Sequence, residues 1–244
     1  METMNYITNR LKKGPLHFTL IDPEKQTPEK AGKIAKIAEE AGTDLIMVGG
    51  STITSQQMVD EAVIKIKENT SLPVVLFPTA AKYLSKHADA VFFMSLLNSK
   101  NTRHVIREQA LGSLIVREYG LEPLPMGYIV IEPGMKVAER GEADVIKRDD
   151  IKTAMGYALA AQYLGMKLVY LEAGSGAPYP VSNEMISKIK EIIEIPLIVG
   201  GGIRDADTAR EKIKAGADIV VTGTVVEEKN MEKKLNEIIK VIKR

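Results

Sequence analysis

The chain has 244 residues, of which 45% are hydrophobic, and its 33 Lys and Arg against 32 Asp and Glu leave a net charge of +1. This balance argues against electrostatic binding to nucleic acid or to an acidic membrane, and the absence of cysteine excludes disulfides, thiolate nucleophiles and cysteine-ligated metals. The N-terminal segment lacks the apolar core of a signal peptide and no apolar run approaches 18 residues, so we expect a cytoplasmic protein without a transmembrane segment.

Short apolar runs alternate with amphipathic segments along the chain. The runs are typical of parallel strands covered on both faces, and they lie at 16–21, 44–48, 73–77, 89–94, 127–132, 167–172, 196–201 and 218–223. Helical spacing of apolar residues occurs at 28–42, 55–68, 102–120, 151–165, 183–193, 205–215 and 230–243. Eight strands with intervening helices predict an α/β fold, a (β/α)8 TIM barrel formed by residues 1–244 as one domain.

One connection is too short for a full helix. Only residues 78–88, PTAAKYLSKHA, separate the third and fourth runs, where we expect a helix of one or two turns or an irregular loop. A doubly wound open sheet is the competing fold.

The C-terminal ends of barrel strands are where chemistry is expected. The sixth run ends in LEAGSG, the seventh runs into VGGGIRD and the eighth ends in TGT, after which a short extra helical turn can follow. Glycine lets backbone amides approach an anion, and the helix that Asp205 is placed to cap adds a favourable dipole. Three such loops favour a phosphate site over turns that only require glycine.

Glu172 directly precedes the first of these loops. A phosphate ester held there would bring a neighbouring hydroxyl within reach of the carboxylate for proton abstraction or orientation. A salt bridge or a helix cap is the simpler role for such a carboxylate. Tyr170 shares Glu172's side of the strand and lies one layer deeper, where it could equally be a core aromatic.

Asp22 and Ser51 follow the first and second runs, on neighbouring strands. One carboxylate and one hydroxyl suit Mg²⁺, which retains waters and takes its other ligands from substrate phosphates. Asp22 could instead initiate a turn with Pro23, and Ser51 could cap the next helix.

The three histidines show no metal-ligand spacing. We expect His17 to be packed or to face the surface, and His87 and His104 to lie on the surface. Neither a P-loop nor a GxGxxG motif is present, which argues against a nucleotide kinase or an NAD enzyme.

Seven segments together resemble geranylgeranylglyceryl phosphate synthases and their bacterial heptaprenylglyceryl phosphate relatives. They are HFTLIDPEK (17–25), IMVGGST (46–52), FPTAAKYLSKHADAVFFMSLLNSKN (77–101), GYIVIEPG (127–134), YLEAGSGAP (170–178), VGGGIRD (199–205) and TGT (222–224). The resemblance covers nearly the whole chain and is greatest to the larger, mainly archaeal subgroup. It implies a modified TIM barrel in which a short mobile segment replaces the third helix.

The resemblance also implies a reaction. The family joins sn-glycerol 1-phosphate to a polyprenyl diphosphate, here geranylgeranyl diphosphate, and forms 3-O-geranylgeranyl-sn-glycerol 1-phosphate and diphosphate, which makes the first ether bond of archaeal membrane lipids. Asp22 and Ser51 match its Mg²⁺ positions, and Glu172, with Tyr170, matches the catalytic region that engages the glycerol hydroxyls. The glycerol phosphate positions match Tyr170, Leu171, Glu172, Ala173, Gly174, Ser175, Gly176, Gly201, Gly202, Gly223 and Thr224.

A prenyl tail requires an apolar trough, for which 92–98, 124–130 and the region of Tyr83 and Leu84 are candidates as well as ordinary core. Since the family forms dimers or hexamers, we expect a homo-oligomer, and residues 102–120 have more apolar surface than one core face needs. A peripheral membrane contact is left open. So are two rival functions, a sugar-phosphate isomerase and a non-catalytic carrier of a phospholigand or prenyl lipid.

Overall fold

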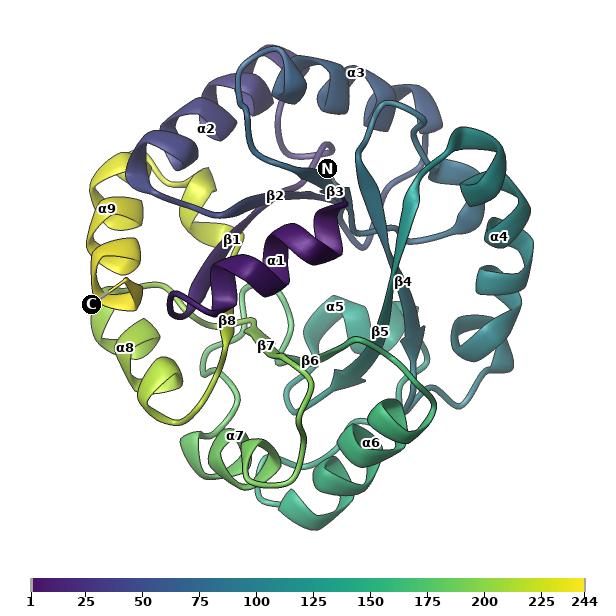
Figure 1. The fold of residues 1–244 in the computed structure, drawn as a ribbon, viewed down its shortest axis with the longest axis vertical. Helices are drawn as coiled ribbons and strands as arrows, with labels where there is room; N and C mark the ends of the chain where they lie inside the picture. The colour runs from purple at the N-terminus through teal and green to yellow at the C-terminus, as the bar shows by residue number, and fades with distance from the viewer. Residues whose placement is uncertain (1, 244) are drawn as a thin grey trace.

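The computed structural model describes residues 2–243, and its eight parallel strands close into a barrel in chain order (Figure 1). The last strand pairs with the first, with Ile219 opposite Leu16. Closure confirms the barrel prediction and rules out the open sheet. The strands are β1 (Leu16–Ile21), β2 (Leu45–Val48), β3 (Val74–Leu76), β4 (Ala90–Leu96), β5 (Glu122–Val130), β6 (Leu168–Glu172), β7 (Leu197–Gly200) and β8 (Ile219–Thr222).

Helices surround the barrel and fall within the predicted segments (Figure 1). They are α2 (Pro28–Ala41), α3 (Gln56–Lys67), η2 (Arg103–Arg107) with α4 (Glu108–Tyr119), α6 (Ile151–Tyr163), α7 (Asn183–Lys190), α8 (Ala206–Lys214) and α9 (Met231–Ile242). Asp205 caps α8 as expected, because its carboxylate accepts the Thr208 amide at 2.8 Å. Among residues 2–243, no helix is both long and apolar enough to cross a bilayer.

The connection between β3 and β4 holds only η1 (Ala81–Tyr83), a single 3₁₀ turn, so the predicted short element is confirmed. Every other strand is followed by a longer helical element before the next strand begins. The barrel wall is therefore thinner at this position, and α4 lies close to η1. Gly112 of α4 faces Ala81 and Leu84 across this gap.

Three elements differ from the prediction. Helices α1 (Thr3–Leu11) and α5 (Met135–Arg140) were not expected, and β5 begins at Glu122 rather than near 127. Its first half contains Pro123 and Pro125, which argue against a strand. The Pro125 carbonyl faces β6, and the nitrogen of the same residue faces the same way. Strand β6 pairs with β5 only from Leu168 onward, so this nitrogen lies opposite no strand residue of β6 and the proline costs no ladder hydrogen bond. The extra turn η3 (Thr224–Glu227) follows β8 as predicted.

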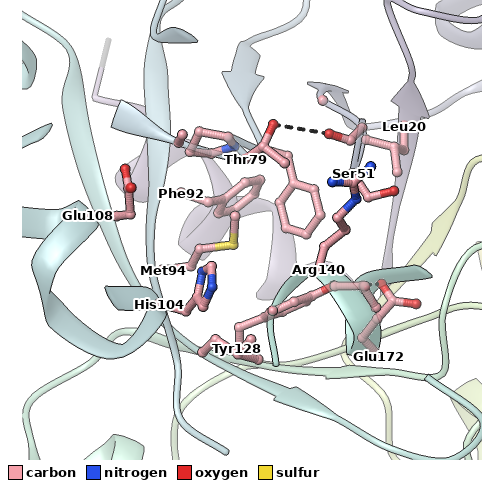
Figure 2. A pocket seen from close by; sticks show the side chains of 18 of the residues that line it. Leu20, Ser51, Thr79, Phe92, Met94, His104, Glu108, Tyr128, Arg140 and Glu172 are labelled. Carbon is pink, nitrogen blue, oxygen red and sulfur yellow. Dashed lines mark hydrogen bonds between the residues drawn. The ribbon is translucent and has the colours of Figure 1, made fainter. Parts of the chain in front are cut away.

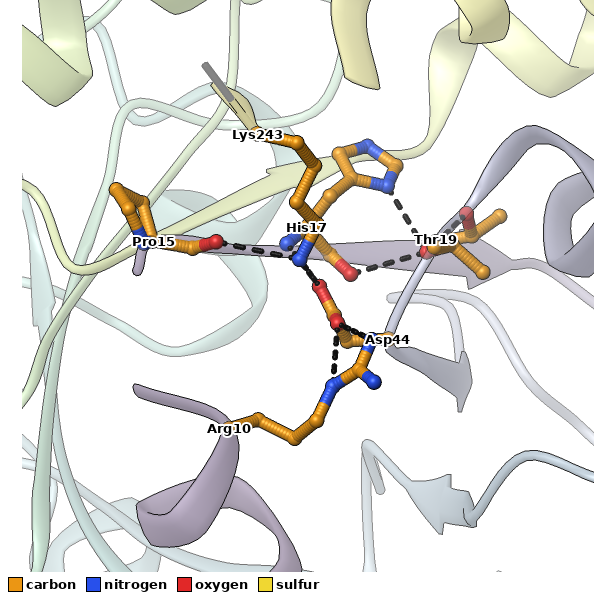
Figure 3. Close-up of polar contacts among 7 residues, drawn as sticks. Arg10, Pro15, His17, Thr19, Asp44 and Lys243 are labelled. Carbon is orange, nitrogen blue, oxygen red and sulfur yellow. Dashed lines mark hydrogen bonds and ion pairs between the residues drawn. The ribbon is translucent and has the colours of Figure 1, made fainter. Parts of the chain in front are cut away.

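Helix α1 closes the N-terminal opening of the barrel, where its buried Ile7 joins the interior cluster that includes Phe18 (Figure 1). Asp44, which is fully buried, holds both ends of the chain to this base. Its carboxylate accepts Arg10 Nε of α1 at 3.0 Å and pairs with Lys243 beyond α9 (Figure 3). A buried carboxylate needs such partners, since desolvation would otherwise destabilise it.

His17 lies in the same region, in the layer between the barrel and the helices. Its ring nitrogens lie 2.9 Å from Thr43 Oγ1 and 2.9 Å from Thr222 Oγ1. Burial lowers the pKa of His17 to about 3, from an ordinary value of 6.5. The residue is thus a neutral histidine packed in the interior, which is one of the two placements expected from the sequence.

We predict that His17 makes stability fall as the pH drops from 6.5 towards 3. The folded pKa lies below the unfolded one, so the unfolded chain binds a proton that the folded chain does not, and acid costs up to about 1.4 kcal/mol per pH unit in this window. Denaturant titrations at several pH values measure the free energy of unfolding of wild type and of His17→Gln. The carboxylates contribute equally to both proteins, so the difference between their pH profiles is the contribution of His17. Parallel pH profiles for the two proteins would contradict this account.

Candidate active site

A cavity of about 520 Å³ opens at the C-terminal ends of the strands and extends towards the gap between η1 and α4 (Figure 2). One end of the cavity is polar and includes Asp22, Ser51, Glu172, Ser175 and Gly223. The other end is mainly apolar and includes Leu84, Val91, Phe92, Phe93, Met94, Leu96, Gly112 and Val116, with the polar side chains of His104, Glu108 and Gln109 beside them. The predicted segment 92–98 and Leu84 contribute to this end, whereas 124–130 lines the cavity only through Tyr128, and Tyr83 does not line it.

Glu172 lies at the end of β6 with its carboxylate in the cavity wall, and only 6% of the residue is exposed. Its Oε1 accepts the Gly174 amide at 2.6 Å, and its Oε2 accepts the Tyr128 hydroxyl at 3.3 Å. Burial raises the pKa of Glu172, and these hydrogen bonds, with one from Tyr170, only partly offset that effect. A raised pKa suits a carboxylate that accepts a proton during a reaction.

Tyr170 is buried beneath Glu172 and does not line the cavity. Its ring stacks on Phe77 with centroids 5.7 Å apart and meets Tyr128 edge-on at 5.2 Å. A Cβ on Gly200 would overlap its hydroxyl, so glycine makes room for it there. The geometry makes Tyr170 a core aromatic that supports the Glu172 carboxylate, rather than a group that faces a ligand.

The loops after β6 and β7 touch at glycine. A Cβ added to Gly201 would lie 2.5 Å from Glu172 Oε1 and 2.6 Å from the Gly174 nitrogen. Gly201 also has φ +83°, and Gly174, Gly176 and Gly202 have φ of +99°, +77° and +73°. Such left-handed conformations strongly favour glycine. The sequence pattern therefore reflects both backbone conformation and a close approach of two loops.

These loops leave donors available for an anion. Among residues 2–243, the amides of Ser175, Gly176, Gly201 and Gly202 have no acceptor. Gly223 lines the cavity from the third loop, and Thr224 begins η3 behind it. The structure therefore brings together the predicted phosphate loops of the sixth, seventh and eighth strands.

Besides Tyr170, two further predicted substrate residues face elsewhere. Leu171 and Ala173 are fully buried among the residues that pack the barrel against its helices. Alternation along the strand explains this, because Glu172 points to the opposite side. Only the backbone of Leu171 and Ala173 could belong to the site.

His104 corrects the sequence interpretation, since it lines the cavity and its side chain is only 20% exposed. It lies beside Met94 and Tyr128 in Figure 2. His104 belongs to η2, a π-helical turn that adds a residue to the turn and changes which side chains face inward. A regular 3.6-residue pattern cannot reveal such a turn. His87 is exposed, as expected.

Gln109 of the following helix also lines the cavity and was not singled out in the sequence. Its amide nitrogen donates to the Met94 carbonyl, whereas its Oε1 is buried without a partner among residues 2–243. Nothing in the sequence pattern distinguishes it from the other polar residues of that helix.

Asp22 fits a hard cation. Its carboxylate lies against Gly50, where a Cβ would overlap it, and its Oδ1 accepts the Glu24 amide at 3.1 Å. Burial raises the pKa of Asp22, and among residues 2–243 no basic side chain pairs with it, because Lys25 pairs with Glu227 at 2.7 Å.

Ser51 lines the same wall, so a carboxylate with spare acceptor capacity and a hydroxyl are available together. These oxygen donors fit Mg²⁺. Residues 2–243 contain no cluster of three or more His, Cys, Asp or Glu able to hold a metal, so the remaining ligands would be water or substrate phosphates.

A closed (β/α)8 barrel with unpaired backbone amides and an adjoining apolar trough at its C-terminal face has the architecture typical of phosphate-binding barrels. More closely, the chain belongs to the PcrB family, whose model matches residues 6–242. The geranylgeranylglyceryl phosphate synthase of Thermococcus gammatolerans is 54% identical over 237 residues, which cover 96% of this chain and 94% of that protein. The enzyme of the same name from Picrophilus torridus is 50% identical over 243 residues, which cover 99% and 100%.

A solved structure agrees with these relatives. It is the crystal structure of (S)-3-O-geranylgeranylglyceryl phosphate synthase from Thermoplasma acidophilum in complex with substrate sn-glycerol-1-phosphate. The two structures are similar with a TM-score of 0.97, the two sequences are 45% identical, and the match covers 100% of this chain and 99% of that one. The resemblance seen in the sequence is thereby confirmed.

We predict that Gly201→Ala abolishes anion binding whereas Gly165→Ala does not. Both glycines have nearly the same backbone, φ +83° and +82°, so alanine costs each about 1–3 kcal/mol of strain. Only at Gly201 does the new Cβ also collide with Glu172, since nothing lies within 4 Å of a Cβ on Gly165. Titration with inorganic phosphate, followed by ³¹P NMR, measures binding. Equal affinity in the two variants would contradict the proposed pocket.

Proposed function

We propose that the chain is a geranylgeranylglyceryl phosphate synthase, which transfers the geranylgeranyl group from its diphosphate to sn-glycerol 1-phosphate and forms 3-O-geranylgeranyl-sn-glycerol 1-phosphate and diphosphate. The relatives named above support this reaction, as does the glycerol phosphate bound in the neighbouring structure. The observation that carries the proposal is one cavity in which a buried carboxylate and Ser175, whose amide has no acceptor among residues 2–243, adjoin an apolar trough, with Gly201 packed directly against that carboxylate. A cytoplasmic location belongs to the same proposal.

The glycerol phosphate binds with its phosphate at the amides of the three loops after β6, β7 and β8. These donors and the dipole of α8 favour a dianion without requiring a metal. The C3 hydroxyl then faces Glu172, which lies between the phosphate loops and the rest of the cavity. Binding the alcohol at both ends fixes the direction of its attack.

Glu172 orients that hydroxyl and accepts its proton. The hydroxyl oxygen bonds to C1 of the prenyl chain, the bond from C1 to the diphosphate oxygen breaks, and the proton passes to the carboxylate. Tyr128 and the Gly174 amide hold the carboxylate in place. When bound by Asp22 and Ser51, Mg²⁺ would neutralise charge on the departing diphosphate.

The apolar end of the cavity accommodates the prenyl tail. Burial contributes roughly 0.8 kcal/mol per CH₂, so partial cover of a long tail outweighs the polar contacts. The trough passes between η1 and α4, where a full third helix would otherwise stand. Gly112, Ala80 and Ala81 keep this passage wide.

A homo-oligomer remains part of the proposal. Helix α4 and the turn before it expose Ile106, Leu111 and Leu114 at 60%, 65% and 75%, which supports burial of this face against a partner. A dimer, a hexamer and a peripheral membrane contact are distinguished by light scattering and vesicle sedimentation.

We predict that Glu172→Gln lowers turnover by about 10²-fold or more while glycerol phosphate still binds. The amide keeps the size of the side chain and loses the ability to accept the proton. Because only the ionised carboxylate accepts a proton, the wild-type rate should also rise as the pH passes through the raised pKa of Glu172. The variant has no carboxylate at this position and should not show this rise. Initial rates across pH measure both effects, and unchanged turnover would refute the role.

We predict that Gly112→Leu discriminates against long donors. A Cβ at this position lies 3.4 Å from Ala81 Cβ and 3.7 Å from Leu84 Cδ1, so a leucine extends into the passage. The KM for the geranylgeranyl donor should rise about tenfold, because the tail would lose the burial of about two CH₂ groups. The KM for the shorter geranyl donor should change little. Gly156→Leu on α6 is the control, because nothing lies within 4 Å of a Cβ there. A uniform effect on both donors would show that the tail takes another path.

The proposed function itself is tested by incubating the protein with labelled sn-glycerol 1-phosphate, Mg²⁺ and prenyl diphosphates of several lengths. An ether-linked product is expected, with preference for the geranylgeranyl donor, and chelation of Mg²⁺ should stop its formation. No product from any donor would leave the carrier function standing. Conversion of a sugar phosphate instead would indicate the isomerase.

A further inference from the structure

Arg204, directly after the GGGI segment, contacts the loop that follows β6. Its terminal nitrogen donates to the Gly176 carbonyl at 2.7 Å and to the Ala177 carbonyl at 3.0 Å. The same loop is closed by a backbone hydrogen bond from the Ala177 amide to the Gly174 carbonyl at 3.1 Å. The loop's carbonyls are thus occupied from the side of α8.

Two more cations hold the remainder of this loop in the same way. Arg148 Nε donates to the Pro180 carbonyl at 3.2 Å, and its guanidinium lies over the Tyr179 ring at 5.1 Å. Lys212, which is 2% exposed, donates to the Val181 carbonyl at 2.9 Å. In each case a cationic side chain bonds to a backbone oxygen.

The charges of these cations are not neutralised by direct pairing. Among residues 2–243, no side-chain nitrogen of Arg148, Arg204 or Lys212 lies within 4.0 Å of a carboxylate oxygen. Burying a cation without a counter-charge is costly, and neutral carbonyls compensate only in part. Of the three, Lys212 is buried and the two arginines are half-buried, and together they place positive charge beside the loop.

A peptide carbonyl and the amide that follows it point in opposite directions. The bond from Arg204 to the Gly176 carbonyl therefore supports the bond from the Ala177 amide to the Gly174 carbonyl, which closes the turn, and inside this turn the amides of Ser175 and Gly176 have no acceptor among residues 2–243. Ser175 lines the cavity. Arg204 bonds to the carbonyls of this loop and does not itself line the cavity.

We propose that Arg204 is a positioning residue for the phosphate dianion of the acceptor substrate. It fixes the loop so that free amides face the cavity, and it supplies an unpaired positive charge beside them. This inference rests on the proposed function, because it assigns a role within the same phosphate pocket. Arg148 and Lys212 extend the positive field along the loop.

The test compares Arg204→Met and Arg204→Lys with Arg210→Met. Arg210 lies on α8 as well, but it is paired with Asp207 at 2.5 Å on the surface, so it controls for loss of one positive charge on this helix. Calorimetry measures binding of sn-glycerol 1-phosphate without the prenyl donor at low and high salt. Steady-state kinetics give the KM of each substrate separately.

Arg204→Met should weaken glycerol phosphate binding about tenfold or more, as expected for loss of charge-assisted hydrogen bonds, and should reduce its salt dependence. The KM for the prenyl donor should not change. Arg204→Lys should restore the salt dependence and only part of the affinity, because lysine cannot form the same forked bonds. Arg210→Met should behave as wild type.

Wild-type affinity in Arg204→Met would overturn the inference, and so would an equal rise in both KM values, which a merely structural role predicts. These outcomes are separate from failure of the proposed function. In that case the wild-type protein itself would neither bind glycerol phosphate nor form the ether.

Discussion

The close approach of two loops around one buried carboxylate is the constraint on which the site depends. Gly201 passes so near Glu172 and the Gly174 nitrogen that no side chain fits between them. This contact fixes the carboxylate, directs it into the cavity and places the amides of both loops at the same point. A close-packed interior transmits small displacements, so one methyl group here would move the acid and the anion pocket together.

A second constraint is the thin wall between β3 and β4. Because only η1 stands there, the cavity extends past the barrel to α4 and gains an apolar end. Stability is maintained elsewhere, at the base of the barrel, where Asp44 binds both ends of the chain (Figure 3). Separation of the site from this anchor is typical of barrel enzymes, in which one face carries the chemistry and the other the stability.

The sequence predicted the features that depend on local pattern. Continuous apolar runs located the strands, and glycines after Glu172 and Val199 located the pocket, because left-handed backbone leaves a direct trace in residue type. Features that depend on partners distant in sequence were missed. The inward turn of His104 arises from a π-helical turn, and the contact of Arg204 with the Gly176 carbonyl joins two loops, so neither has a local signal. Likewise, the prolines of β5 concealed the first half of that strand, whose neighbour β6 starts later.

The most direct measurement is a crystal structure of this protein with sn-glycerol 1-phosphate. The account predicts the phosphate at the amides of the loops after β6, β7 and β8, with the C3 hydroxyl within hydrogen-bonding distance of the Glu172 carboxylate. A phosphate bound elsewhere in the cavity, or a glycerol turned so that its hydroxyls point away from Glu172, would contradict it.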